Sequence, residues 1–201
     1  MFKNLSKICL PILLVVLASC GRVPNTIGEN GSPSCKYVDL STLSVSVSLD
    51  VPYVEQLTNY CGPASLEMIF SYYGTNMSQQ EIGAGIVGPQ GVGADQLAQF
   101  SVDQGYDATK EYCGLSSLLE KLNSKTPVLV RVINNSGTNG HFMVVTGYDL
   151  ITETIFINDP ALPDNQEMSF NDFKVIWDIK TLPEGNNSSY LMLVIVPAET
   201  K

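Results

Sequence analysis

The hydrophobic and polar positions after residue 60 follow a helical period. Apolar side chains recur at spacings of three and four residues, which places them on one face of a predicted helix. The members of this face are Leu66, Ile69, Phe70 and Tyr73. Pro63 suits the first turn of that helix, where a missing N–H costs nothing, and Gly74 is expected to end it. Cys61 therefore lies at or just before a helix N-terminus, where unpaired N–H groups and the positive end of the dipole favour a thiolate.

The pattern along the rest of the chain predicts helices first and strands later. Further helices are predicted at 78–86, 94–104 and 115–123, the first because Ser78 and Glu81 form a capping box. A short strand or extended lead-in is predicted at 42–49, strands at 108–112, 128–133, 142–148, 154–157 and 190–196, and a short helix or turn at 169–177. This order is typical of an α+β fold with a mostly antiparallel sheet.

Composition sets the size of the fold and argues against one class of partner. The chain has 201 residues, of which 44% are hydrophobic and 15% charged, enough for one globular domain with a buried core. The net charge of -9 argues against nucleic acid as a partner, because so acidic a protein has little to neutralise phosphates with.

The first twenty residues have the organisation of an export signal. Lys3 and Lys7 form a basic region, and the apolar run at 10–17 is too short for a comfortable membrane span. The run ends in Leu17-Ala18-Ser19-Cys20, which resembles the lipobox of bacterial lipoproteins. The resemblance implies cleavage before Cys20 and a lipid on its sulfur. The alternative is an ordinary secretory signal with a chance cysteine.

These features divide the chain into three expected parts. They are a lipoprotein signal peptide at 1–19, a lipidated Cys20 with a flexible tether at 20–48, and a folded domain at 49–201. The lipid would hold the protein in the bacterial cell envelope, on the outer side of the cytoplasmic membrane or in the outer membrane.

The five cysteines then have different expected fates. Cys9 lies in the signal and Cys20 would carry the lipid. In an oxidising compartment Cys35 and Cys113 could pair and leave Cys61 as the free thiol, although the sequence alone cannot fix the geometry of a disulfide. A zinc site is not expected, since there is one histidine and no Cys-x-x-Cys, and no cofactor is indicated.

His141 is the only histidine, and a predicted hairpin gives it a carboxylate partner. The strands at 142–148 and 154–157 are joined by a few residues and should pair antiparallel. With the turn centred near residues 150 and 151, paired residue numbers sum to about 300, so that His141 lies opposite or beside Asp159. The carboxylate would fix the imidazole tautomer and stabilise the imidazolium. Taken alone, Asp159 before Pro160 is better explained as a turn-forming residue.

Gln56 completes a set of four residues with complementary chemistry. It lies five residues before Cys61, and its side-chain amide could reach the position where an oxyanion develops beside the Cys61 N–H. Taken alone, Gln56 is better explained as a residue facing solvent. Together, an amide, a nucleophile, a base and an orienting carboxylate form the set that thiol catalysis needs.

The sequence around these residues resembles the peptidase C39 family and its stand-alone C39-like relatives. The resemblance lies in Gln56 followed by Cys61-Gly62-Pro63-Ala64-Ser65, with Met68 and Tyr72-Tyr73-Gly74, in Gly140-His141-Phe142-Met143-Val144-Val145-Thr146-Gly147-Tyr148, and in Ile157-Asn158-Asp159-Pro160. It covers roughly residues 51–196 and implies the papain-like cysteine protease fold, in which a helical half that carries the nucleophile packs on an antiparallel sheet. By position it implies Cys61 as nucleophile, His141 as general base, Asp159 as orienting carboxylate and Gln56 as oxyanion donor.

The resulting hypothesis is a lipid-anchored cysteine peptidase that hydrolyses peptide or amide bonds in a peptide or protein substrate. Cleavage of double-glycine leader peptides is not implied, because the sequence contains no transporter or ATPase segment and the anchor would lie outside the cytoplasm. Two alternatives stay open: a transglutaminase-like acyltransferase with the same order of Cys, His and Asp, and a binding lipoprotein that keeps the fold without activity. The sequence indicates no oligomeric state.

Overall fold

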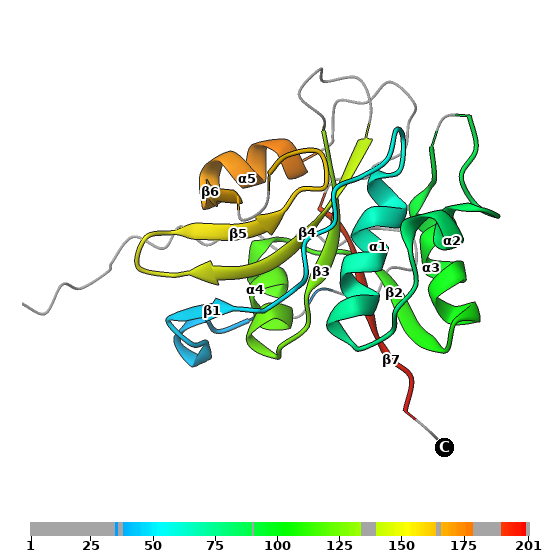
Figure 1. Cartoon of the computed structure of the whole chain (residues 1–201). Coiled ribbons are helices and arrows are strands. Elements are labelled where there is room, and N and C mark those ends of the chain that lie inside the picture. The colour runs from blue at the N-terminus through cyan, green and yellow to red at the C-terminus, as the bar shows by residue number, and fades with distance from the viewer. Residues whose placement is uncertain are drawn as a thin grey trace, which may run out of the picture.

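The computed structural model describes residues 35, 38–89, 91–133, 140–163, 166–178 and 190–199. Within these ranges the chain forms a seven-stranded antiparallel sheet (Figure 1). Six strands follow in the order β2-β7-β3-β4-β5-β6, and β1 pairs with the C-terminal end of β4. The strands are β1 Ser46–Ser48, β2 Tyr106–Tyr112, β3 Val128–Ile133, β4 Gly140–Asp149, β5 Thr154–Asn158, β6 Gln166–Ser169 and β7 Leu191–Pro197.

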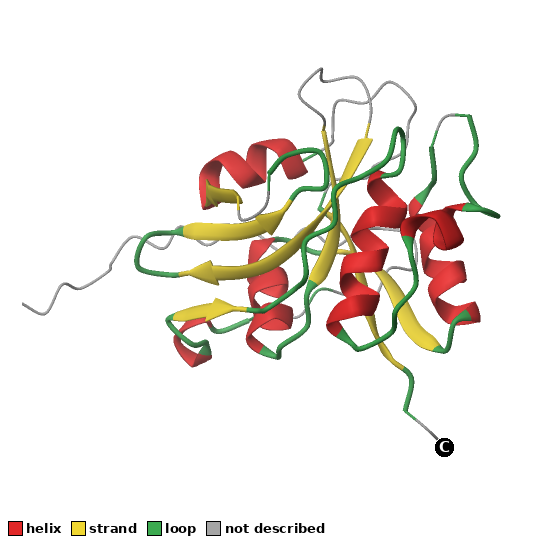
Figure 2. Ribbon diagram, in the orientation of Figure 1, coloured by secondary structure: helices red, strands yellow, loops and turns green. Residues whose placement is uncertain are grey.

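Helices cover both faces of the central strands. They are α1 Cys61–Tyr72, α2 Gln79–Gly83, α3 Ala94–Asp103, α4 Leu115–Asn123 and α5 Phe170–Trp177, with a short 3-10 helix η1 at Leu40–Thr42. In Figure 2, α1 passes in front of the sheet with α2 and α3 beside it, and α4 lies behind. Every residue of β4 from Phe142 to Tyr148 is therefore buried, whichever face it points to. This is the α+β architecture that the sequence predicts, with helices packed on an antiparallel sheet.

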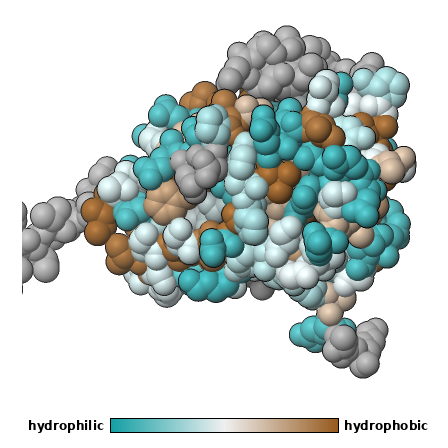
Figure 3. All heavy atoms as spheres, in the orientation of Figure 1, coloured by the Kyte–Doolittle hydropathy of each residue, from teal (hydrophilic) through white to brown (hydrophobic). Residues whose placement is uncertain are grey.

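The core is continuous through the sheet, and aromatic side chains fill it from both sides. Phe70 of α1 stacks on Tyr106 of β2 with ring centroids 4.5 Å apart. From α5, Trp177 is fully buried, and its Nε1–H donates to the Leu191 carbonyl oxygen at 2.9 Å. Hydrophobic side chains on the face shown in Figure 3 are scattered among hydrophilic ones. No helix in the described ranges has both the length and the apolar character of a membrane span.

The folded region begins before the boundary at residue 49 that the sequence suggests. Val47 of β1 is buried, and β1 pairs with β4 from Ser46↔Asp149 to Ser48↔Gly147. Residues 46–48 therefore belong to the sheet rather than to a tether. The predicted signal peptide, Cys20 and the tether up to residue 34 lie outside the described residues.

The β4–β5 hairpin differs from its predicted register. Paired residue numbers sum to 303 near the turn, as in Asp149↔Thr154, and to 302 beyond a bulge at Thr146, as in Val144↔Asn158. The sum exceeds the predicted value of about 300 because the turn is centred one residue later, and the extra residue Thr146 on β4 lowers the sum from 303 to 302 beyond the bulge. Continued by one residue, the register sets Asp159 opposite Met143, so His141 is two residues further along the same face of β4.

Candidate active site

Cys61 is the first residue of α1, as the hydrophobic pattern indicates, and its thiol is free. The next residue must be small, because a Cβ on Gly62 would lie 2.5 Å from Val92 Cγ1. Glycine at this position lets the helix N-terminus pack closely against Val92 and Leu97. The sulfur is thus held on a buried helix end, where N–H groups without helical partners gather.

His141 stands between Cys61 and Asp159. Its side chain is 14% exposed, and its Nε2 lies 2.6 Å from Asp159 Oδ1. It also hydrogen-bonds the Cys61 thiol, and because Nε2 is occupied by the carboxylate, Nδ1 is the nitrogen left for sulfur. The structure therefore brings together three of the four residues that the sequence singles out.

Asp159 is both a turn residue and the partner of His141. Its Oδ1 accepts the Ala161 N–H at 2.9 Å, and its carbonyl oxygen accepts the Leu162 N–H at 3.1 Å. These bonds close a tight turn around Pro160 and fix the direction of the carboxylate. The two explanations of Asp159 offered by the sequence are therefore compatible, because the turn is what aims the side chain at the imidazole.

The pKa values of Cys61 and His141 move in opposite directions. Burial raises the pKa of the Cys61 thiol, but hydrogen bonds from His141 and from the Phe142 and Gly62 N–H groups, with the charge of His141, lower it below its usual value. Burial lowers the pKa of His141, but hydrogen bonds and charges from Asp159 and Cys61 raise it to about 9. Both shifts favour the ion pair, a thiolate beside an imidazolium, over the neutral thiol and imidazole.

Gln56 reaches the site through its backbone. Its N–H donates to the Pro160 carbonyl oxygen at 2.9 Å, which ties its loop to the turn that follows Asp159. The phenolic O–H of Tyr53 makes a second tie, to the Leu162 carbonyl oxygen. The side-chain Oε1 of Gln56 is buried and has no hydrogen-bond partner among the described residues.

Gln79 is the residue near this site that the sequence did not reveal. Its side chain is buried and hydrogen-bonds the backbone on either side of Gln56. In the sequence it is one of two adjacent glutamines after the N-cap Ser78, so only its burial in the fold distinguishes it.

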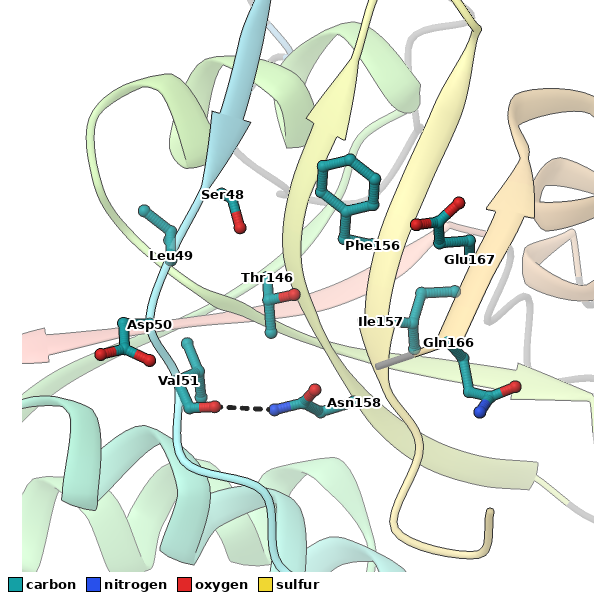
Figure 4. A pocket seen from close by; sticks show the side chains of 10 residues that line it. All are labelled: Ser48, Leu49, Asp50, Val51, Thr146, Phe156, Ile157, Asn158, Gln166 and Glu167. Carbon is teal, nitrogen blue, oxygen red and sulfur yellow. Dashed lines mark hydrogen bonds between the residues drawn. The ribbon is translucent and has the colours of Figure 1, made fainter. Parts of the chain in front are cut away.

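A polar cavity of about 340 Å³ lies beside the Asp159 end of β5 (Figure 4). Its lining comprises Ser48, Leu49, Asp50, Val51, Thr146, Phe156, Ile157, Asn158, Gln166 and Glu167, and includes none of the four predicted site residues. In it, Asn158 Nδ2–H donates to the Val51 carbonyl oxygen at 2.9 Å. This bond holds the segment that leads to Gln56 against the strand that leads to Asp159.

The other cysteine and metal predictions concern residues away from Cys61. Cys35 and Cys113 form a disulfide, with Cα atoms 5.5 Å apart. In the described part of the chain, no three His, Cys, Asp or Glu side chains are grouped so that they could hold a metal ion. Cys20 lies outside the described residues.

Comparison with known proteins identifies relatives by sequence and by fold. The sequence profile of the Peptidase_C39 like family matches residues 48–181. The peptidase domain of Streptococcus ComA, described as a bi-functional ABC transporter of a quorum-sensing pathway, has a similar structure. Its TM-score is 0.57 at 22% identity, with 72% of this chain and 96% of that chain covered. No curated protein matches the sequence significantly.

Two further solved structures share the fold. A putative C39-like peptidase from Bacillus anthracis has a TM-score of 0.56 at 16% identity, over 77% of this chain and 99% of that one. A double-glycine-motif protease from an AMS/PCAT transporter, solved in complex with the leader peptide, has a TM-score of 0.54 at 19% identity, with 76% of this chain and 95% of that chain covered. At these identities the structures establish the fold, and the sequence profile establishes kinship.

Proposed function

The chain belongs to the Peptidase_C39-like family, and from this premise we propose that Cys61, His141 and Asp159 hydrolyse peptide or amide bonds through an acyl-thioester. The family predicted from the motifs is thereby confirmed, and the chain is a C39-like cysteine peptidase. The observation that carries the proposed chemistry is the continuous contact from the Cys61 thiol through the His141 imidazole to the Asp159 carboxylate.

The chemistry follows from the protonation states of the pair. The Cys61 thiolate attacks the substrate carbonyl carbon, and the carbonyl oxygen takes up the negative charge. The His141 imidazolium gives its Nδ1 proton to the leaving amine as the C–N bond breaks, which leaves a thioester on Cys61. Neutral His141 then takes a proton from water, hydroxide adds to the thioester, and the acid product leaves with the thiolate restored.

Asp159 and Gln56 have supporting roles in this proposal. Asp159 accepts the Nε2–H throughout and stabilises the positive imidazole. The oxyanion would receive hydrogen bonds from the Cys61 N–H, at the helix start, and from the Gln56 side-chain amide. The support for Gln56 is its loop, which is hydrogen-bonded to the Asp159 turn, and a side-chain amide whose buried Oε1 has no partner among the described residues.

The proposed substrate is a peptide or protein. A related protease binds a leader peptide in its solved structure, which supports a peptide-binding cleft in this fold. Leu57 and Leu162 are exposed beside the site, where they would contact side chains of the bound peptide.

We also propose that the enzyme is a lipoprotein of the bacterial cell envelope, anchored through Cys20. The support is the basic region with Lys3 and Lys7, the apolar run at 10–17 and the Leu17-Ala18-Ser19-Cys20 sequence that follows it. Mass spectrometry of the membrane-extracted protein should find diacylglycerol on an N-terminal Cys20, and a Cys20→Ser variant should leave the membrane fraction. An unlipidated protein that begins at another residue would refute the anchor.

The catalytic proposal is tested by comparing wild-type protein with Cys61→Ala on a mixed peptide library. The wild type should release fragments with free carboxyl termini, and Cys61→Ala should release none above background. Products joined to an added amine instead of water would indicate an acyltransferase. Equal activity in the two proteins would exclude Cys61 as the nucleophile, and an inactive wild type would favour a binding protein.

A further inference from the structure

The side chain of Gln79 spans Gln56 by bonding the backbone on both of its sides. Gln79 is 6% exposed. Its Oε1 accepts the Leu57 N–H at 2.8 Å, and its Nε2 donates to the Glu55 carbonyl oxygen at 2.8 Å. The orientation of this amide is unambiguous, because a flipped amide would set donor against donor and acceptor against acceptor.

Together these bonds fix the backbone of Gln56 almost completely. The two peptide units that flank Gln56 carry four polar groups. Gln79 engages the Glu55 carbonyl and the Leu57 N–H, and the Pro160 carbonyl oxygen accepts the Gln56 N–H. The Gln56 side chain, in contrast, has no described partner for its buried Oε1. The direction of its amide is therefore set by the backbone rather than by a hydrogen bond from a neighbouring residue to Oε1.

Gln79 is in turn fixed to the helix that begins with Cys61. Its own N–H donates to Glu67 Oε2 at 2.6 Å, and Glu67 belongs to α1. Ser78 and Glu81 close a capping box around the same turn of α2. The position of Gln56 is thus fixed relative to the helix that begins with Cys61 through Gln79, and relative to the Asp159 turn through Pro160.

We propose that Gln79 is a positioning residue that aims the Gln56 amide at the oxyanion formed when Cys61 attacks a carbonyl carbon. The inference rests on the proposed roles of Cys61 and Gln56. The hydrogen bonds of Gln79 within the described ranges go to Leu57, Glu55 and Glu67 and not to Cys61, His141 or Asp159, so its removal should leave the thiolate–imidazolium pair intact. A step that builds an oxyanion should slow, and a step that does not should keep its rate.

Two reagents that use the same thiolate separate these steps. Acylation by p-nitrophenyl acetate passes through a tetrahedral oxyanion, whereas alkylation by iodoacetamide is a displacement at carbon without one. In Gln79→Met, which keeps the length of the side chain but loses both hydrogen bonds, the release of p-nitrophenolate should slow about 10- to 100-fold, since a misplacement near 1 Å can cost ~10²-fold. The rate of alkylation and its pH profile should match the wild type.

The neighbouring residue provides the matched control. Gln80 is exposed on the same turn, so Gln80→Met should leave both rates unchanged. In the double variant Gln56→Ala with Gln79→Met, acylation should be no slower than in Gln56→Ala alone, because Gln79 acts through Gln56. A merely structural residue would instead lower both rates or add its loss to that of Gln56→Ala, which would overturn the inference. If Gln79→Met does not fold, Gln79→Glu, which keeps the acceptor for Leu57 and loses the donor, serves the same comparison.

The two proposals fail in different ways. A wild type that acylates normally and a Gln79→Met that acylates equally fast would refute the role of Gln79 alone. A wild type in which iodoacetamide modifies Cys61 but p-nitrophenyl acetate does not acylate it would refute the proposed function, and the role of Gln79 with it.

Discussion

The largely buried imidazole of His141 has a thiol on one nitrogen and a carboxylate on the other. This arrangement raises the pKa of His141 to about 9 and lowers that of Cys61, although burial alone would move both the other way. The reactive ion pair should therefore exist between the lowered pKa of the thiol and about pH 9. Below this window the sulfur is protonated, and above it the imidazolium has lost its proton.

The alkylation of Cys61 tests the lower edge of this window. In the wild type the rate with iodoacetamide should rise with a midpoint below pH 8.5, about the pKa of a free thiol. In His141→Ala the midpoint should move upward, because burial then raises the thiol pKa against only the Phe142 and Gly62 N–H groups. A small-molecule thiol in the same buffers is the control. A midpoint that does not move in the variant would show that His141 does not lower the thiol pKa.

Replacements of Asp159 test the upper edge. Asp159→Asn keeps an oxygen that can accept both the His141 Nε2–H and the Ala161 N–H, but it removes the negative charge. The alkaline limb of hydrolysis should therefore move below pH 9, since the imidazolium is less stabilised. Asp159→Ala should also lose orientation and lower kcat by ~10²-fold, the lower end of what a positioned acid–base group contributes. Identical pH profiles of kcat in Asp159→Asn and wild type would argue against the charge effect.

Residue chemistry explains why most of this site can be proposed from sequence and one part cannot. Histidine occurs once, and a cysteine at a helix start is a distinct signal, so His141 and Cys61 stand out. Gln79 has no such signal, because a buried glutamine and its exposed neighbour Gln80 look alike until the chain folds. Its role depends on a loop more than twenty residues earlier in the chain.

At the scale of elements, local signals gave better predictions than long-range pairing. The helix α4 and the strand β3 have the predicted bounds, and the capping box of α2 is present, although α2 ends at Gly83 rather than near residue 86. The strand β6 was missed because it is four residues long and has no apolar alternation that favours a strand. The hairpin register differs from the predicted sum of about 300 by two or three, because residue types do not show which residue a turn is centred on or where a bulge occurs.

The pairing of β1 with β4 depends on a glycine. A Cβ on Gly147 would lie 2.2 Å from the Val47 carbonyl oxygen and 2.9 Å from Phe156 Cδ2, so Gly147→Ala should push β1 or β5 away from β4. Forcing an extra carbon into a packed site costs about 1–3 kcal/mol, and urea denaturation should show this loss. Gly85→Ala, where a Cβ meets nothing within 4 Å, is the control and should change stability by less than about 0.5 kcal/mol. Equal midpoints for the two variants would contradict the clash.

At the scale of the whole molecule, the segment from residue 38 to Gln56 is hydrogen-bonded to the rest of the fold at successive points along its length. Its β1 strand pairs with β4, its Val51 carbonyl accepts the Asn158 amide, and its Gln56 N–H is bonded to Pro160. Along the chain, each of these interactions lies nearer to Cys61 than the one before. The segment ends five residues before Cys61, the first residue of α1, so its course sets the distance between Gln56 and Cys61.

The disulfide lies just before this segment in the sequence and should contribute to stability rather than to chemistry. It links Cys35 to Cys113, 78 residues later, at the junction between the edge strand β2 and α4. A bridge that closes so long a loop restricts the unfolded chain and typically adds about 2–4 kcal/mol to the free energy of unfolding.

In a Cys61→Ala background, where no free thiol in the folded domain can exchange, the reduced protein should unfold at a correspondingly lower urea concentration than the oxidised protein. In otherwise wild-type protein, Cys35→Ala with Cys113→Ala should keep the alkylation rate of Cys61 under native conditions. Equal urea midpoints for the oxidised and reduced forms would show that the disulfide does not stabilise the fold. Slower alkylation of Cys61 in the double variant would show that the disulfide also affects the geometry of the site.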